Sequence, residues 1–457
     1  MSNSITKDLE SGSIGKLLFK LAIPAITAQL INALYNIIDR MYIGRIPDIG
    51  SLALTGVGVT FPIIILISAF AVLIGMGGAP LASIKLGENK KDEAEKILGN
   101  CFSLLLGISI LLIIFFFITK SSLLYMFGAS KDTFSYANEY LTIYLFGTTF
   151  VLLSLGMNTF INSQGFAKVA MCTVLIGAIL NIILDPIFIF VFNLGVVGAA
   201  VATVISQAVS CIWVLNFLYK GDAILKIKGK YMKLNKKVVL SVLALGISPF
   251  IMQSTESLVQ IVFNSGLQKY GGDSYVGAMT IIGSIMQIFY MPLMGIAQGA
   301  QPIIGYNFGA KNYTRVKKAC KMLILSALTF SIVSWCIVTF ASKYIVSIFT
   351  QDPALTDLTI WGMRIFFGGL IILGAQDSSQ NAFVALGQAK LSLSLALLRK
   401  IVLLIPLAIV LPMILGVKGI FFAEPIADII ATIVTVSAFI WRTKKLFSVK
   451  PEESLSI

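Results

Sequence analysis

The sequence predicts an all-α polytopic membrane protein with twelve transmembrane helices in two pseudo-symmetric lobes of six helices each. Composition is the first observation behind this prediction: 57% of the residues are hydrophobic, 12% are charged, and the mean hydropathy is +0.91. The second is that long apolar segments alternate with short polar ones, and the third is that motifs of the first half recur in the second. Each apolar segment reaches the length of about 20 residues that a helix needs to cross the hydrocarbon layer.

The apolar segments define the predicted spans in chain order. In the first half they cover residues 14–44, 52–78, 96–119, 138–160, 168–192 and 195–219. In the second half they cover residues 237–266, 275–300, 316–342, 358–384, 391–415 and 417–441. Several are longer than about 25 residues, which indicates tilted or bent helices that extend past the bilayer. The first span follows a short polar stretch directly, so we expect no cleavable signal peptide.

A lysine-rich, weakly apolar segment divides the chain between spans six and seven. This linker, residues 220–236, separates a predicted N-terminal lobe (14–219) from a predicted C-terminal lobe (237–441), and residues 442–457 form a tail. We expect the segments 87–95 and 309–318 to be solvated turns and residues 450–457 to be disordered.

The internal repeat indicates how the two halves are related. Residues 75–87 read GMGGAPLASIKLG and residues 297–309 read AQGAQPIIGYNFG, so that Gly77 pairs with Gly299 and Gly87 with Gly309 at an offset of 222. Residues 165–168 recur at 387–390, and residues 194–198 recur at 415–419. Because each half has an even number of spans, both halves share one orientation and are related by an axis along the membrane normal. Duplicated apolar halves are typical of membrane transporters, whose site lies between two similar bundles around a central cavity.

The net charge of +14 follows membrane topology rather than a nucleic-acid-binding pattern. Lysine and arginine gather in the loops after even-numbered spans and near both ends of the chain. The opposite loops carry far fewer basic residues: Arg45, Lys120, Lys131, Lys269, Lys343 and Lys418. This asymmetry predicts a multi-pass protein of the cytoplasmic (plasma) membrane with both termini in the cytoplasm.

Several chemistries are excluded by what the sequence lacks. The chain has no histidine, no G-x-x-x-x-G-K-[ST] motif, and five cysteines that share no close spacing. We therefore expect no histidine-bearing metal site, no P-loop binding of ATP, no cofactor and no enzymatic activity. The expected partners are membrane lipids and small amphipathic molecules, and the expected state is a monomer. Energy for transport would come from an ion gradient or from a partner chain.

Carboxylates within the N-terminal spans carry the strongest functional signal, because burial of a carboxylate costs several kcal/mol unless it is paired, protonated or hydrated. Asp39 follows Tyr35 by four residues and Asp185 follows Asn181 by four, so each pair shares a helix face. Topology places two phenols, two amides and a hydroxyl at the same depth as these acids. The candidate cation-binding residues are Tyr35, Asn36, Asp39, Tyr140, Asn181, Asp185 and Thr203.

Such an oxygen-rich cluster suits either Na⁺, a hard cation with oxygen ligands, or a proton. A possible Na⁺ at Asp39 and Asp185 is the one metal ion that the sequence suggests. The alternative for Asp39 is structural, namely an ion pair with Arg40 or Arg45 that anchors the helix at the membrane boundary.

The C-terminal half has its own intramembrane charges. Glu256 and Asp377 are expected to face inward and are candidates for attracting a cationic substrate. Glu424 and Asp428 share a helix face and either bind a cation or pair with Arg399. The candidate substrate-binding residues are Glu256, Met286, Tyr290, Gln298, Gln301 and Asp377.

These motifs, over essentially the whole chain, resemble the multidrug and toxic compound extrusion (MATE) family in its MepA-like subgroup. The matching features are Pro24, the stretches 35–39, 75–87, 181–186, 298–309 and 416–428, and Ile405-Pro406. The resemblance implies a twelve-helix antiporter with a central V-shaped cavity that exports amphipathic, often cationic compounds in exchange for Na⁺ or H⁺. It places the N-lobe cation site at the seven candidate positions given above. The competing interpretation is a flippase for lipid-linked precursors, which would need a strongly cationic cavity, whereas Arg399 and Lys400 are outnumbered by intramembrane acids.

Overall fold

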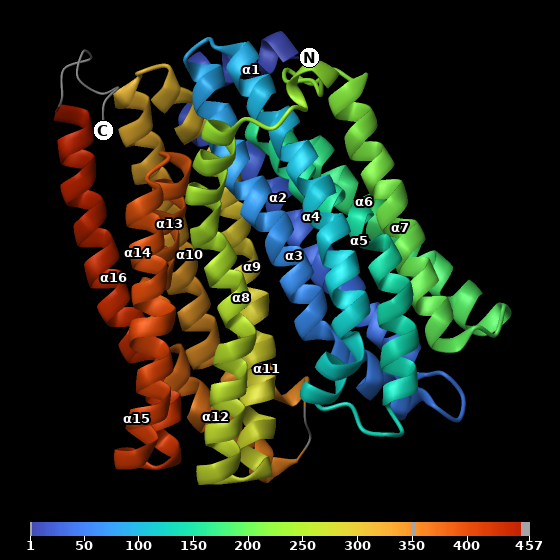
Figure 1. Ribbon diagram of the computed structural model, residues 1–457. Coiled ribbons are helices and arrows are strands. Elements are labelled where there is room, and N and C mark those ends of the chain that lie inside the picture. The colour runs from blue at the N-terminus through green and yellow to red at the C-terminus, as the bar shows by residue number, and fades with distance from the viewer. Residues whose placement is uncertain (1, 350–351, 449–457) are drawn as a thin grey trace.

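The computed structural model describes residues 2–349 and 352–448, and none of these residues forms a β-strand. Twelve of its helical segments are long and apolar enough to cross a membrane. This confirms the predicted all-α polytopic fold. The first helix and the end of the last one lie on the same side of the molecule, at the top of Figure 1. We call this the terminal side and the opposite side the distal side.

The first half of the chain forms the helices at the right of Figure 1. In order they are α1 (Ser2–Ser11), α2 (Ile14–Gly44), α3 (Gly50–Gly87), α4 (Lys91–Met126), α5 (Phe134–Ser163), α6 (Ala167–Pro186), the π-helical turn η1 (Ile187–Val191) and α7 (Gly195–Tyr219). Helix α6 ends at Pro186 because proline has no N–H to donate to the carbonyl of Ile182, and the π-helical turn follows directly.

The second half forms the helices at the left of Figure 1. In order they are η2 (Gly229–Tyr231), α8 (Lys236–Gly271), α9 (Asp273–Gly309), α10 (Tyr313–Phe340), α11 (Ser342–Ser347), α12 (Pro353–Phe366), η3 (Phe367–Gly369), α13 (Leu370–Ala385), α14 (Ala389–Leu397), the π-helical η4 (Leu398–Leu404), α15 (Ile405–Leu415) and α16 (Val417–Ser448). Spans ten and eleven are therefore composite. Helix α16 extends seven residues past the predicted end of span twelve, and residues 450–457 lie outside the described part of the chain.

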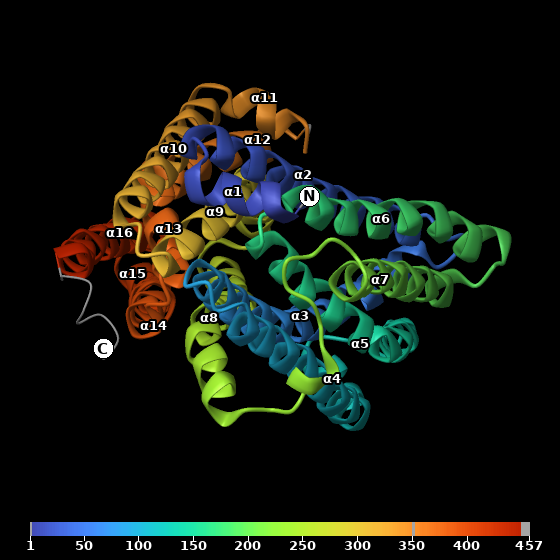
Figure 2. The same ribbon diagram turned by 90° about the horizontal axis from the view of Figure 1, so that it is seen from above.

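The leading segment of each half of the chain packs against the other half. The start of α2 (Ile14, Leu17, Leu18 and Leu21) and Leu9 of α1 are buried in one apolar cluster with residues of α9, α10, α13, α14 and α16. In return, the linker packs into the cluster of the first half through Ala223, Leu225 and Ile227, all buried. Figure 2, the view from above in Figure 1, shows α1 over α9 and the linker beside α4. The boundaries predicted for the two lobes, 14–219 and 237–441, remain a prediction.

Hydrogen bonds hold both leading segments in place. The Arg315 guanidinium donates to the carbonyls of Leu9 (3.1 Å) and Gly12 (2.8 Å) and to the side-chain oxygen of Asn307 (2.9 Å). On the linker, the backbone N–H of Leu225 donates to the side-chain oxygen of Gln164 (2.8 Å). The segment 309–318, predicted to be a solvated turn, thus contains an arginine that points into the protein.

The two halves meet along two helix pairs, α2 with α9 and α3 with α8, and α3 also contacts α9. The repeated glycines lie in these contacts. Gly77 of α3 packs on the backbone of α8 at Val242 and Gly246, and Gly299 of α9 packs on Ala22 of α2. Without a side chain at these positions, the helix backbones approach closely.

Candidate functional site

Asp39 and Asp185 come together in the N-terminal half. Asp39 lies near the distal end of α2 and Asp185 in the last turn of α6, and both are buried, with exposed fractions of 8% and 0%. The two carboxyl groups lie within hydrogen-bonding reach of each other. Two carboxylates at this separation repel, and away from water this repulsion is screened weakly.

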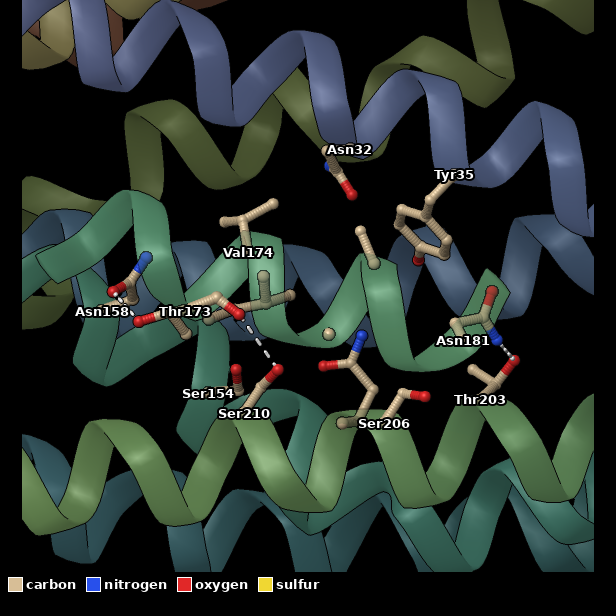
Figure 3. A pocket seen from close by; sticks show the side chains of 14 residues that line it. Asn32, Tyr35, Ser154, Asn158, Thr173, Val174, Asn181, Thr203, Ser206 and Ser210 are labelled. Carbon is tan, nitrogen blue, oxygen red and sulfur yellow. Dashed lines mark hydrogen bonds between the residues drawn. The ribbon is translucent and has the colours of Figure 1, made fainter. Parts of the chain in front are cut away.

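Helices α5, α6 and α7 bring most of the other predicted residues to this acid pair. The Asn181 amide donates to the Asp185 carboxylate (3.1 Å) and to the Thr203 hydroxyl (3.3 Å). The Tyr140 side chain is buried beside Thr203, within hydrogen-bonding reach. Tyr35 faces the same space from α2, as Figure 3 shows. Asn36 differs, because its amide donates to the backbone carbonyl of Asn32 on its own helix (2.7 Å).

Three buried oxygen atoms at this position have no hydrogen-bond donor. They are Oδ1 of Asp39, Oδ2 of Asp185 and Oδ1 of Asn181. An acceptor that is buried without a donor costs free energy, and a buried carboxylate costs more. A proton shared between the carboxylates would satisfy the two carboxylate oxygens, and a cation there could take the amide oxygen as a further ligand. No group of three or more Asp, Glu, Cys or His side chains that could hold a metal ion occurs in the described ranges, so a cation here would add neutral oxygens to the two carboxylates.

No ion pair among the described residues supports the alternative in which Asp39 pairs with Arg40 or Arg45 to anchor the helix. Within residues 2–349 and 352–448, neither Arg40 nor Arg45 forms a salt bridge with Asp39. The Arg40 guanidinium instead stacks on the Phe61 ring, 4.2 Å from its centroid. Asp39 is thus a buried acid that lies beside a second acid, and Arg40 acts on it from beyond salt-bridge distance.

A polar cavity of about 60 Å³ adjoins the acid pair on its terminal side. Figure 3 shows residues of four helices around it, including Asn32 and Tyr35 of α2, Asn158 of α5, Thr173 and Asn181 of α6, and Thr203, Ser206 and Ser210 of α7. Sequence reasoning missed most of this lining. A signal existed, because Thr203, Ser206, Gln207 and Ser210 recur at helical spacing and give span six a polar face.

The four acids predicted within the C-terminal spans, Glu256, Asp377, Glu424 and Asp428, each have a polar or charged partner. Arg399 forms salt bridges with Glu424 (3.1 Å) and Asp428 (2.7 Å), and each side chain is at most 10% exposed. Arg399 lies in the π-helical η4, a type of helix that recurs at functional positions. Glu424 and Asp428 were predicted either to bind a cation or to pair with Arg399, and in the structure they pair with Arg399.

The predicted substrate-binding residues separate into two groups. In the first, Glu256 pairs with Lys400 (2.8 Å), and Asp377 accepts hydrogen bonds from the Tyr290 hydroxyl (2.9 Å) and the Asn381 amide (3.1 Å). Met286 packs near Tyr290 in the same apolar cluster. The second group, Gln298 and Gln301, lies on α9 next to Gly299, where α9 packs on α2; the Gln298 carbonyl accepts from Asn162 of α5 (3.4 Å).

Comparison with known proteins agrees with this architecture. The family model described as MatE matches the chain twice, over residues 24–187 and 249–410, as the internal repeat predicts. The Multidrug export protein MepA of Staphylococcus haemolyticus is 29% identical over 435 residues, which cover 94% of this chain and 93% of that protein. MepA of Staphylococcus saprophyticus is 27% identical over 429 residues, covering 93% of each chain.

Solved structures of similar fold cover nearly the whole chain. A crystal structure of MATE in the bent conformation has a TM-score of 0.91 at 23% identity and covers 97% of this chain and 98% of its own. An outward-facing multidrug resistance MATE family transporter has a TM-score of 0.89 at 24% identity, with the same coverage. Since the two family-model matches together span well over half of the sequence, the chain belongs to the MatE family.

Proposed function

We propose that this chain is a cation-coupled antiporter that exports amphipathic, often cationic compounds across the cytoplasmic membrane in exchange for Na⁺ or H⁺. The observation that carries the proposal is the buried acid pair, with three oxygen atoms that lack a donor at one position. The MepA relatives are named multidrug export proteins, which supports the same direction of transport.

Coupling follows if ion and substrate stabilise different states of the two lobes. An inward-moving ion that neutralises Asp39 and Asp185 removes their repulsion and changes the packing of α2, α6 and α7 around them. A ligand shifts a conformational equilibrium only through its different affinities for the two states. Ion occupancy would therefore select the state in which substrate binds weakly and leaves on the outer side.

The second candidate function, flipping of lipid-linked precursors, has less support. A pyrophosphate headgroup needs free basic side chains. Arg399 is paired with Glu424 and Asp428, and Lys400 is paired with Glu256. These two basic side chains are thus already paired with acids.

The test is substrate flux in reconstituted vesicles, first under an imposed Na⁺ gradient and then under a pH gradient alone. We expect one of these gradients to drive ethidium transport in the unmodified chain, which also assigns the ion. Asp185→Asn should abolish the driven component, whereas Glu139→Gln, an exposed acid on α5, should leave it intact. Driven transport that survives in Asp185→Asn contradicts the mechanism.

Orientation and oligomeric state belong to the same proposal. The positive-inside asymmetry supports termini in the cytoplasm, so that the terminal side would face the cytoplasm, and a monomer is the expected state. Labelling of Lys91→Cys by an impermeant thiol reagent, in a chain without its native cysteines, should require access to the cytoplasm. Labelling of intact cells from outside contradicts this orientation.

A further inference from the structure

The polar cavity beside the acid pair is too small for an amphipathic drug. Its volume of about 60 Å³ compares with about 300–1,000 Å³ for the pockets of drug-sized ligands. At about 10–15 Å³ for each water it holds about four to six waters. The cavity is therefore matched in size to water and a small cation, and not to the transported compound.

Its length runs along the helices, away from the acid pair and toward the terminal side. On α6 the lining extends from Asn181 back to Thr173, eight residues, or about 12 Å at 1.5 Å for each residue. On α7 it extends from Thr203 to Ser210, about 10 Å in the same direction. Figure 3 shows Asn181 and Thr203 at one end and Asn158 at the other.

The lining is neutral and contains polar atoms that lack partners. It includes no charged side chain among its described residues. Ser206 and Asn181 line the cavity, and both residues are 98% buried. The Ser206 hydroxyl and the side-chain carbonyl oxygen of Asn181 have no hydrogen-bond partner within the described part of the chain. Buried polar atoms of this kind in a polar cavity are normally satisfied by water.

A hydrogen-bonded link closes the far end. The Thr173 hydroxyl donates to the Asn158 side-chain oxygen (3.0 Å), and the Ser210 hydroxyl donates to the Thr173 carbonyl (3.1 Å). Six residues separate Thr173 from the first residue of α6 on the terminal side, about 9 Å along the helix. These three side chains form the end of the cavity that faces the terminal side.

The other half of the chain fills the equivalent space with a built-in cation. At the repeat offset of 221 or 222, Arg399 corresponds to Gly177 or Ala178, Glu424 to Thr203, and Asp428 to Gln207. All four N-terminal positions line the cavity. Where one half holds a fixed guanidinium between two carboxylates, the other half has small and neutral residues, an open space and unpartnered acids nearby.

We propose that this cavity is an ion compartment inside the N-terminal lobe: it holds water, accepts the coupling cation from Asp39 and Asp185, and passes it toward the terminal side. The inference rests on the proposed cation coupling and adds a route for the ion. The direct route between the lobes is closed on the terminal side in this structure, where α3 packs on α8 and α9 packs on α2 without side chains at the glycines. The intralobe route does not require those contacts to open.

The experiment introduces a removable block after folding. Ser206→Cys is made in a chain whose five native cysteines are replaced by alanine, with Ser331→Cys as the matched control. Both serines are buried, with exposed fractions of 2% and 0%, and both have an unpartnered hydroxyl, but Ser331 of α10 does not line this cavity. Methyl methanethiosulfonate then reacts with the thiolate of any cysteine that water reaches: a mixed disulfide to the thiomethyl group forms, the S–SO₂ bond of the reagent breaks, and methanesulfinate leaves.

We expect Cys to be modified at position 206 and not at position 331. Modification at 206 should lower ion-driven ethidium flux at least about tenfold, because a cation that crosses a dehydrated constriction loses solvation, and a reductant should restore it. Ion affinity, measured by equilibrium binding of Na⁺ or by proton uptake on purified protein, should change by less than about twofold.

Three outcomes overturn the proposal. No modification at position 206 means that the cavity is dry. Modification with unchanged flux means that the ion takes another route, and modification that also removes ion binding makes Ser206 part of the acid site itself. If the cysteine-free chain shows no ion-driven flux while the unmodified chain does, Ser206→Cys is tested in the native background. If neither responds to a gradient, it is the proposed coupling that fails, and the ion route fails with it.

Discussion

The reciprocal contact of Gly87 and Gly309 offers a direct test of how the terminal side stays closed. Gly87, at the end of α3, packs on the backbone of α9 at Tyr306, and Gly309, at the end of α9, packs on the backbone of α3 at Ile84. A Cβ built on either glycine overlaps the facing carbonyl oxygen. Because the obstacle is backbone and not a side chain, the helices themselves must separate to accept a methyl group.

The expected shift can be estimated from the cost of overpacking. Extra methyl groups in a packed interface cost about 1–3 kcal/mol, and this cost falls only on the state in which α3 and α9 touch. The equilibrium should therefore move toward the open terminal side by about 5- to 150-fold for Gly309→Ala, with a similar value for Gly87→Ala. The double variant should fall short of the product, since both substitutions act on one contact.

Two glycines in the same helices serve as controls. A Cβ at Gly58 of α3 or Gly283 of α9 meets no atom within 4 Å. Their alanine variants gain the same helix propensity, about 1 kcal/mol, without the clash. Spin labels at Lys91→Cys and Lys318→Cys, exposed positions at the starts of α4 and α10, report the separation of the lobes on the terminal side.

The alanine variants at Gly87 and Gly309 should raise the population at the longer label distance, while Gly58→Ala and Gly283→Ala should not. Equal distance distributions in all four variants would refute the reasoning. A loss of thermal stability without a change of distance would mean that both conformational states contain the contact, and that the glycines serve packing alone.

Three further changes test the charged and polar contacts. Asn181→Ala removes the unpartnered amide oxygen beside the acid pair and should weaken Na⁺ binding by about 10- to 150-fold if this oxygen is a ligand, as measured by Na⁺ titration of purified protein. Proton uptake should not weaken, because the lost amide N–H donates to the ionised Asp185 carboxylate; loss of proton uptake together with unchanged Na⁺ affinity would contradict this assignment of Asn181. Arg399→Met leaves Glu424 and Asp428 buried without a cation and should lower the free energy of unfolding by about 3–5 kcal/mol, whereas the triple variant with Glu424→Gln and Asp428→Asn should recover most of it. Arg315→Ala removes the donors to the carbonyls of Leu9 and Gly12 and should lower the free energy of unfolding by about 1.5–3 kcal/mol. Lys318→Ala, a change at an exposed position on the same helix, should leave the free energy of unfolding unchanged.

The helical spans and the acid pair could be predicted because both depend on local pattern and on the cost of burial. A run of about 20 apolar residues has few alternatives to a membrane helix. An aspartate within such a run must find a partner, a proton or water. These two arguments bring Asp39, Asp185, Asn181 and Thr203 to similar depth without any knowledge of tertiary structure, and the structure places them together.

Contacts between distant segments could not be predicted in this way. Nothing in the pattern around Arg315 shows that its guanidinium faces backbone carbonyls 303 and 306 residues earlier. The linker has the same limitation, because its lysines indicate a solvated segment while Leu225, 0% exposed, inserts into the core. Such exchanges are set by the arrangement of the lobes, which sequence periodicity does not contain. The polar face of α7 is different, because the helical spacing of its polar residues could be predicted from the sequence. The residues of other helices that face it could not.

Under the proposed coupling, the divergence of the two halves would explain why one acid cluster exchanges a cation and the other does not. In the C-terminal half, a guanidinium that cannot leave is bound between Glu424 and Asp428, and replacing such a buried triad is costly unless all members change together. In the N-terminal half, the equivalent positions are Gly177 or Ala178, Thr203 and Gln207, and the acids lie one to two turns away with unpartnered oxygens. The N-terminal half thus has a space at the positions of the triad and, nearby, two acids with unpartnered oxygens. Under the proposed coupling, a mobile cation would take the place that the fixed guanidinium has in the other half, and its exchange would link the conformation of the N-terminal half to a gradient.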